Sequence, residues 1–296
     1  MAVPGLGWAG LDRKPMCTKC IKFYLEKYKL DVTPADWTFY QSAVIYFWQS
    51  LWLTYGVFNI CRRSDVGYIY VAYPVLPPIL YVVFAFSLAC NISWLLIWDR
   101  EYMEVALVFV NLMSCTLFIC LVVSLRRLHE FGYVMVSHGL TREIWYIRIL
   151  VQNGLAMFAI WSTVAGMFNF GVVLTYRTGA KQEVASTVSL SIFTLEILAW
   201  WMFDNVVFEK HLRYMFTPYL VLIISIAGII SKNYQANEHN RNTVYTVVLF
   251  GLVSVLTVVK VVLVVWRHKH QPIYGIVPDL RRANAGYEVR GLLDAR

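Results

Sequence analysis

Seven long apolar runs follow one another between Trp37 and Trp266, and only short polar links separate them. A run of roughly 18 to 20 apolar residues is long enough to carry a helix through a hydrocarbon core about 30 Å thick. The composition fits such a solvent, because 59% of the residues are hydrophobic and only 15% are charged. The sequence therefore predicts an all-α, polytopic membrane protein built as a seven-transmembrane-helix bundle.

The predicted spans follow the limits of these runs. They cover residues 39–60, 69–97, 103–125, 145–175, 184–208, 214–231 and 243–266. Pro74, Pro77 and Pro78 stand early in the second run, and proline interrupts helical hydrogen bonds that lipid cannot replace. We expect the second helix to be kinked or to start late.

Lysine and arginine indicate the orientation, because they accumulate in cytoplasmic links. If the N-terminus is outside, the inner links hold Arg62, Arg63, Arg126, Arg127, Arg142, Arg148, Lys210 and Arg213. The outer links then hold Arg100, Arg177, Lys181, Lys232 and Arg241. This bias predicts an extramembrane, outer segment 1–38, a membrane domain 39–266 and a basic cytoplasmic tail 267–296. The basic residues of segment 1–38 favour the opposite orientation.

The formal net charge of +8 is better explained by lipid than by nucleic acid. Basic side chains beside membrane spans meet the anionic lipids of the inner leaflet. Zinc-finger spacings and base-reading helices are missing from the sequence. We expect the bilayer as a partner, with anionic lipids at its inner face, no nucleic acid, no metal and no cofactor. A single chain or an oligomer, in the plasma membrane or the endoplasmic reticulum, is compatible with the sequence.

Three cysteines are candidates for modification. Cys17 and Cys20 form a Cys-x-x-Cys pair, which supplies too few ligands for zinc. In an extracellular segment they form a disulfide or stay as two free thiols. Cys61 lies beside Arg62 and Arg63 at an inner helix end, where it is a candidate for palmitoylation or an unmodified thiol.

An ionisable side chain deep within a span points to function, because lipid does not solvate it. Glu196 is the clearest case, near the middle of the fifth run, and Asp204 follows two turns later, on the same predicted seam. Asn111 and Asn153 add amides to the third and fourth runs. The first hypothesis is passage of a small ion or proton along this seam, with Glu196 as the titratable group. The alternative for the amides is interhelical hydrogen bonding, and for Asp204 a local ion pair.

Lys260 lies in the seventh run, where microbial rhodopsins carry a retinal Schiff base. Leu256 stands four residues earlier, where those proteins have an aspartate counter-ion. Lys260 is also close to Trp266 and Arg267. We therefore expect its side chain to reach the inner headgroups instead of holding a cofactor.

The outer link between the second and third runs is acidic. Asp99, Glu101 and Glu104 surround Arg100. At the rim of a pore these acids would concentrate cations. The alternative is a solvated turn.

Residues 88–107 contain Asn91-Ile92-Ser93-Trp94, followed by Trp98. This segment resembles the Asn-x-x-Trp segment of the tryptophan-rich TspO proteins and of small fungal membrane-bound terpene cyclases. The first resemblance implies binding of porphyrins or sterols, and the second implies cyclisation of an isoprenoid epoxide. Leu95 stands where the cyclases have an acid. The second hypothesis is therefore an intramembrane binder or cyclase of apolar ligands, built around Asn91, Trp94 and Glu196.

A third hypothesis is an orphan seven-helix receptor or scaffold. Receptors coupled to G proteins carry Asp-Arg-Tyr-like triads at the inner end of the third helix, whereas Asp99-Arg100-Glu101 precedes that run. The later runs lack Trp-x-Pro and Asn-Pro-x-x-Tyr. Signalling would then depend on the basic inner loops and tail.

Overall fold

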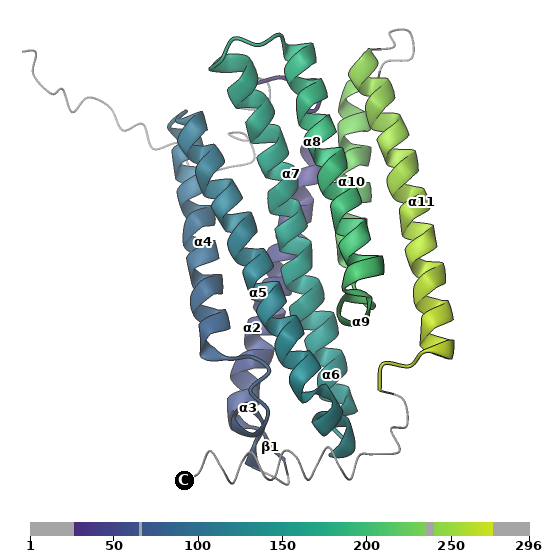
Figure 1. Cartoon of the computed structure of the whole chain (residues 1–296). Helices are drawn as coiled ribbons and strands as arrows, with labels where there is room; N and C mark the ends of the chain where they lie inside the picture. Colours follow the sequence, from purple (N-terminus) through teal and green to yellow (C-terminus); the bar gives the residue numbers. More distant parts are fainter. Residues whose placement is uncertain (1–26, 65–66, 235–239, 275–296) are drawn as a thin grey trace, which may run out of the picture.

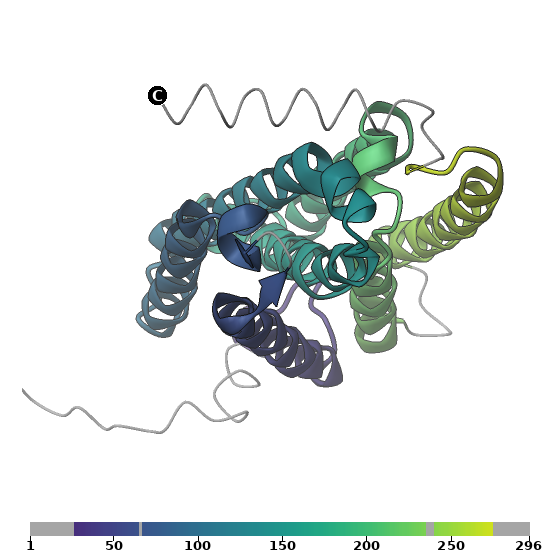
Figure 2. The ribbon, with the colours of Figure 1, turned by 90° about the horizontal axis from the view of Figure 1, so that it is seen from below.

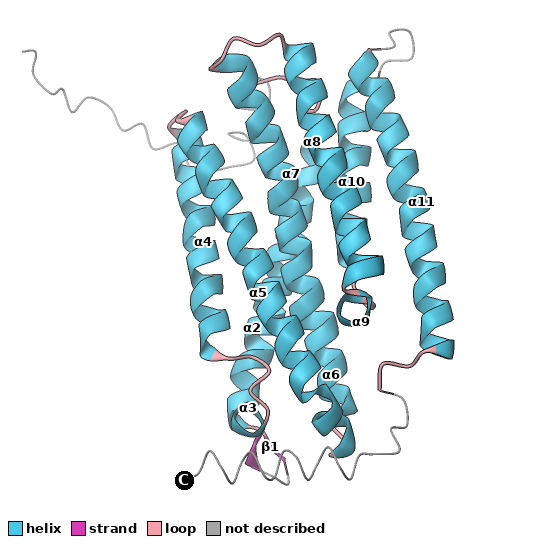
Figure 3. Cartoon of the chain, viewed as in Figure 1, coloured by secondary structure: helices cyan, strands magenta, loops and turns pink. Residues whose placement is uncertain are grey.

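The computed structural model describes residues 27–64, 67–234 and 240–274. Each predicted span is helical over most of its length, and the long helices run side by side in one bundle (Figures 1 and 3). We call the end at the top of Figure 1 the upper end; residues 27–36 lie there. The opposite end, with the short strands and helix α6, is the lower end. Cys17 and Cys20 lie outside the described residues.

Helices make up almost all of the described chain. The long ones are α2 (Tyr40–Cys61), α4 (Pro78–Asp99), α5 (Met103–Ser137), α7 (Asn153–Tyr176), α8 (Gln182–Met202), α10 (Thr217–Asn233) and α11 (Arg241–His270). The short ones are η1 (Asp36–Phe39), α3 (Ile69–Ala72), α6 (Thr141–Tyr146), the π-helical η2 (Ile147–Gln152) and η3 (Phe203–Val207), and α9 (Glu209–Leu212). Strands β1 (Arg63–Ser64) and β2 (Gly67–Tyr68) form a small antiparallel ladder. The predicted all-helical architecture is confirmed.

Five helical segments are long and apolar enough to cross a membrane by themselves. They are Pro78–Asp99, Met103–Ser137, Thr141–Tyr176, Gln182–Val207 and Arg241–His270. Helix α10 is shorter, with 17 residues, and α2 contains polar residues such as Gln41 and Gln49. The chain therefore has the helices of an integral membrane protein.

Helix boundaries differ from the apolar runs for identifiable reasons. Helix α4 starts late, at Pro78, as expected, because proline at the first helical position has no hydrogen bond to lose. Helix α5 continues beyond its apolar run to Ser137. It ends before Gly139, whose φ of 73° suits the left-handed residue that commonly follows a helix. This extension is helical although it is not apolar, because arginine and glutamate have high helix propensity.

Helix α7 lies at the centre of the bundle (Figure 2). It packs against α2, α5, α8 and α10, whereas α4 and α11 lie at opposite edges. All residues from Asn153 to Ile160 are buried. A helix that is apolar on every side is typical of such a position.

The N-terminal segment 27–35 packs into the upper end of the bundle. Leu30, Val32 and Thr33 are fully buried. The Ala35 backbone N–H donates to the Gly228 carbonyl at 3.1 Å. This part of the predicted extramembrane segment therefore belongs to the bundle core, because its apolar side chains fill the space between the helix ends.

Close packing at Gly228 offers a test of this arrangement. A Cβ at this position would lie 2.0 Å from Thr38 Oγ1 and 3.1 Å from Thr38 Cβ. We expect Gly228→Ala to destabilise the protein by about 1–3 kcal/mol, seen as a lower melting temperature in detergent. Gly251→Ala is the matched control, since nothing lies within 4 Å of its Cβ. Equal melting temperatures for the two variants would contradict the contact between η1 and α10.

Candidate functional site

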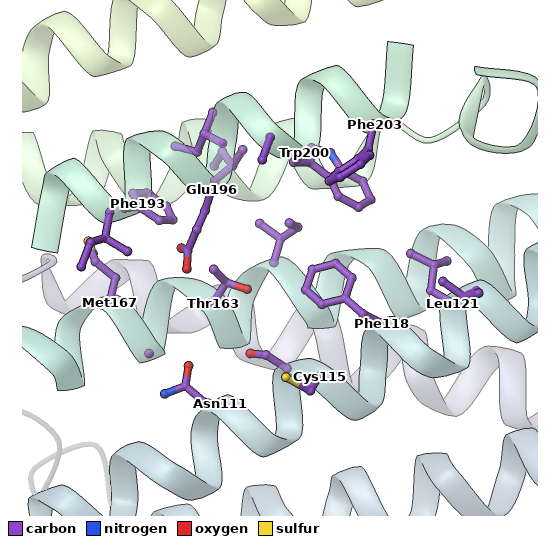
Figure 4. Close-up of a pocket in the computed structure, with 18 of the residues that line it drawn as sticks. Asn111, Cys115, Phe118, Leu121, Thr163, Met167, Phe193, Glu196, Trp200 and Phe203 are labelled. Carbon is purple, nitrogen blue, oxygen red and sulfur yellow. The ribbon is translucent and has the colours of Figure 1, made fainter. Parts of the chain in front are cut away.

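A cavity of about 740 Å³ lies between α5, α7 and α8 (Figure 4). Helices α5 and α8 both pack on α7 but scarcely touch each other, so a space stays open between them. Residues from Leu107 to Arg126 line it on α5, from Ile160 to Phe170 on α7, and from Ser189 to Trp200 on α8. Phe208 and His211 line its lower end.

Most of the cavity wall is apolar and aromatic. The rings of Phe118 on α5 and Trp200 on α8 meet across it, with centroids 5.9 Å apart. Phe170 and Phe193 line it as well. An apolar cavity with a few polar groups is typical of small-molecule sites.

Glu196 supplies the one carboxyl group of this wall. Its side chain points into the cavity, toward Thr163, and Asn111 lies on the facing wall (Figure 4). No described residue forms a hydrogen bond or ion pair with Glu196. Ser189 and Trp200 also line the cavity, and their side-chain Oγ and Nε1 are buried without a partner among the described residues. Because unpaired buried polar groups are costly, this wall is suited to a ligand that pairs with them.

Asp204 belongs to a different cluster, on the far side of α8. Its Oδ1 accepts from Lys260 Nζ of α11 at 2.6 Å, and its Oδ2 accepts from Tyr219 OH of α10 at 2.6 Å. Asn205 Nδ2 donates to the same hydroxyl at 3.2 Å. The π-helical turn η3 turns both Asp204 and Asn205 toward α10 and α11. The expected shared seam with Glu196 is therefore wrong, as is a pairing of Asp204 with its near neighbours.

Lys260 does not reach the lower headgroups. Its side chain is 1% exposed and ends at Asp204, and Nζ also donates to the Leu212 carbonyl at 3.3 Å. The prediction failed for two reasons. Helix α11 continues to His270, which places Lys260 farther from the helix end than the apolar run suggested. A buried carboxylate from another helix then supplies the charge that lipid lacks.

Asn153 does not line the cavity; its side chain links the start of α7 to the start of α10. Its Nδ2 donates to the carbonyls of Arg148 and Tyr214, at 2.9 and 3.0 Å. Its Oδ1 accepts from the backbone N–H groups of Phe216 and Thr217, at 3.1 and 3.3 Å. These bonds satisfy free donors at the start of α10, so Asn153 caps that helix from α7.

Asn91 and Trp94 lie on α4, and neither lines the cavity. Asn91 Nδ2 donates to Tyr46 OH of α2 at 2.8 Å. Trp94 packs beside Trp98, with ring centroids 6.3 Å apart. The structure therefore does not bring these two residues together with Glu196.

The acidic residues of the upper end are tied to basic ones. Glu101 pairs with Lys27 of the N-terminal segment, and Glu104 pairs with Arg177 at 2.6 Å. Asp99 is the last residue of α4. At the lower end of α2, Cys61 is a free, exposed thiol.

Apart from Glu196, the residues of one helical stripe were not foreseen from the sequence. Ser189, Phe193, Glu196, Trp200 and Phe203 follow one another at spacings of three or four and all line the cavity. This periodicity marks one helix face. An aromatic stripe is also the pattern of ordinary packing, so only the gap between α5 and α8 distinguishes it.

Comparison with protein-family models, curated proteins and solved structures finds no match to this chain. Among the described residues, no group of three or more His, Cys, Asp or Glu side chains could hold a metal ion. The geometry of the cavity therefore carries the functional argument.

The buried Asp204–Lys260 ion pair can be tested by removing one partner. Removing one partner leaves a buried charge unpaired, which typically costs about 3–5 kcal/mol. We expect Lys260→Met to lower the melting temperature strongly and the double variant with Asp204→Asn to recover part of the loss. Lys269→Met is the control, because Lys269 is exposed near the end of the same helix. Additive losses in the double variant would contradict a direct pair.

The Lys27–Glu101 pair makes a prediction about pH. The hydrogen bond from Lys27 lowers the pKa of Glu101 below its ordinary 4.5. A lowered carboxyl pKa stabilises the fold above the ordinary value, and this contribution disappears as pH falls through the folded value. We expect Glu101→Gln to lower the melting temperature slightly at pH 7, and the difference from wild type to shrink as the pH falls below 4.5. Because both side chains are exposed, high salt should also shrink the difference. A difference that is equal in low and high salt would refute the ion pair as its cause.

Proposed function

We propose that this protein is a seven-helix integral membrane protein that binds a lipid-like molecule in the cavity between α5, α7 and α8. The observation that carries the proposal is the single unpaired carboxyl group, Glu196, on an otherwise apolar and aromatic wall. The apolar wall takes most of the ligand, and the few polar groups on the wall, Glu196 among them, set its orientation.

The cavity is accessible from the side of the bundle. Val122 of α5 and Ile192 of α8 both line it, and they are 45% and 42% exposed. In a membrane these side chains face lipid, so a ligand enters from the bilayer. The volume of about 740 Å³ falls within the range of roughly 300–1,000 Å³ for small-molecule sites.

The count of seven crossings and the orientation belong to the same proposal. Helix α2, with 22 residues, is about 33 Å long, and α10, with 17, is about 26 Å long. Both lengths are close to the hydrocarbon thickness of about 30 Å. The positive-inside bias places the lower end in the cytoplasm and the N-terminal segment outside. Either the plasma membrane or the endoplasmic reticulum fits.

Passage of an ion or proton has less support from the geometry. Asn111 and Glu196 share the cavity, but Asn153 is occupied as a cap and Asp204 is bonded to Lys260 and Tyr219. Residues 27–35 also fill the upper end. The described polar groups are thus arranged in separate clusters, which favours a binding pocket over a polar track.

Ligand-dependent stabilisation of the purified protein tests the proposal. Binding to the folded state raises the melting temperature, by an amount that grows with ligand concentration. We expect this rise with some members of a panel of long-chain acids, alcohols, sterols and polyprenols. Gly166→Leu should abolish it, because Gly166 lines the cavity and its Cβ would meet only Asn111 and Val110 at 3.5 Å or more.

The matched control is Gly251→Leu, on the exposed side of α11, where nothing lies within 4 Å of the Cβ. This variant should keep the ligand response. Absence of stabilisation across the whole panel, or an unchanged response in Gly166→Leu, would reject the cavity as the site. A pH-dependent ion flux in liposomes that Glu196→Gln abolishes would favour ion passage instead.

A further inference from the structure

We propose that the ligand of this cavity is a long-chain amphiphile with an acidic head group, and that Arg126 binds this head group at the lower end. The inference rests on the proposed function, since it names the class of ligand for the same cavity. The chain of the ligand extends from Arg126 along α5 toward Glu196.

Arg126 is the cationic residue at the lower end of the cavity. It lines the cavity, its side chain is exposed, and no described residue forms an ion pair or hydrogen bond with its guanidinium. The adjacent Arg127 is bonded to Glu130 at 3.2 Å and does not line the cavity. An arginine fork with free N–H groups suits a carboxylate or phosphate.

Two described acidic side chains at the lower end of the bundle already have basic partners. Glu209 lies within 2.5 Å of Arg213 and 3.8 Å of Arg267. Glu130 is held by Arg127. The positive charge of Arg126 is therefore available to a ligand.

A histidine pair adds hydrogen-bonding capacity beside Arg126. The rings of His129 on α5 and His211 on α9 are 4.5 Å apart, and His211 lines the cavity. Burial, together with the nearby His129 and Lys210, lowers the pKa of His211. Near neutral pH this ring is therefore uncharged, and it can still donate one hydrogen bond to an acidic head group.

The two ends of the cavity impose a direction on the ligand. An acidic head group at Glu196 would have to share its site with a second carboxyl group, whereas at Arg126 it meets opposite charge. Asn111 and Arg126 are fifteen residues apart on α5, which corresponds to about 22 Å along the helix. This length exceeds half of a hydrocarbon core of about 30 Å, so the cavity is long enough for a chain that starts at the headgroups of one leaflet.

The test compares an acid with its neutral analogue. Binding of oleate, lysophosphatidate and oleyl alcohol is measured by thermal shift in nanodiscs of phosphatidylcholine, with wild type, Arg126→Gln and Arg127→Gln. We expect Arg126→Gln to weaken the acidic ligands about tenfold or more, the loss expected for a charge-assisted hydrogen bond. The affinity for oleyl alcohol should not change, and Arg127→Gln should resemble wild type.

The outcomes separate the two proposals. A preference for oleate or for lysophosphatidate identifies the head group as a carboxylate or a phosphate. If the alcohol binds as tightly as both acids and Arg126→Gln changes nothing, the acidic head group is refuted while the cavity stands as a lipid site. If none of the three stabilises wild type while a sterol or polyprenol does, the acidic class is again refuted. If no ligand stabilises wild type, both proposals fail.

Discussion

The buried position of α7 is the constraint on which the rest of the bundle depends. Four helices pack on this one element, and its first eight residues are wholly enclosed. Asn153, at its start, caps α10, while Gly171, near its end, leaves room for Leu30 of the N-terminal segment. The cavity exists because α5 and α8 both pack on α7 but scarcely touch each other. Lateral access to the cavity is thus a direct result of how helices are distributed around one central helix.

Charged groups within the predicted spans have two different environments. Asp204 and Lys260 come from different helices and neutralise each other, together with Tyr219, so their cluster is closed. Glu196, only two turns away on the same helical rod, has no such partner. In a medium that offers no hydrogen bonds, this contrast separates a group that stabilises packing from one that is free to interact with a bound molecule. A polar side chain within a span is therefore a better indication of a binding site when no other side chain pairs with it.

Long apolar runs were sufficient to predict where the helices lie, because helices that cross lipid must be long, apolar and able to satisfy their own backbone hydrogen bonds. The late start of α4 could also be foreseen from Pro77 and Pro78. The partners of Asp204 and Lys260 could not be foreseen, since they depend on the π-helical turn η3, which shifts the helix register without a visible sequence signal. Glu196 was recognised as a candidate, but its cavity depends on helix spacing. Arg126 was counted only as an orientation signal, because its lack of a partner is a property of three dimensions.

The N-terminal segment has a consequence for the order of assembly. Asp31 accepts a hydrogen bond from Asn242 at the start of α11, at 2.8 Å, and Ala35 bonds to Gly228 near the end of α10. Segment 27–35 is synthesised before all the helices it contacts, yet its docking site is complete only when the last of them has been inserted. Seating of this segment is therefore a late event in biogenesis. A chain with an absent or misplaced α11 would leave the Asp31 carboxylate without its hydrogen bond from Asn242.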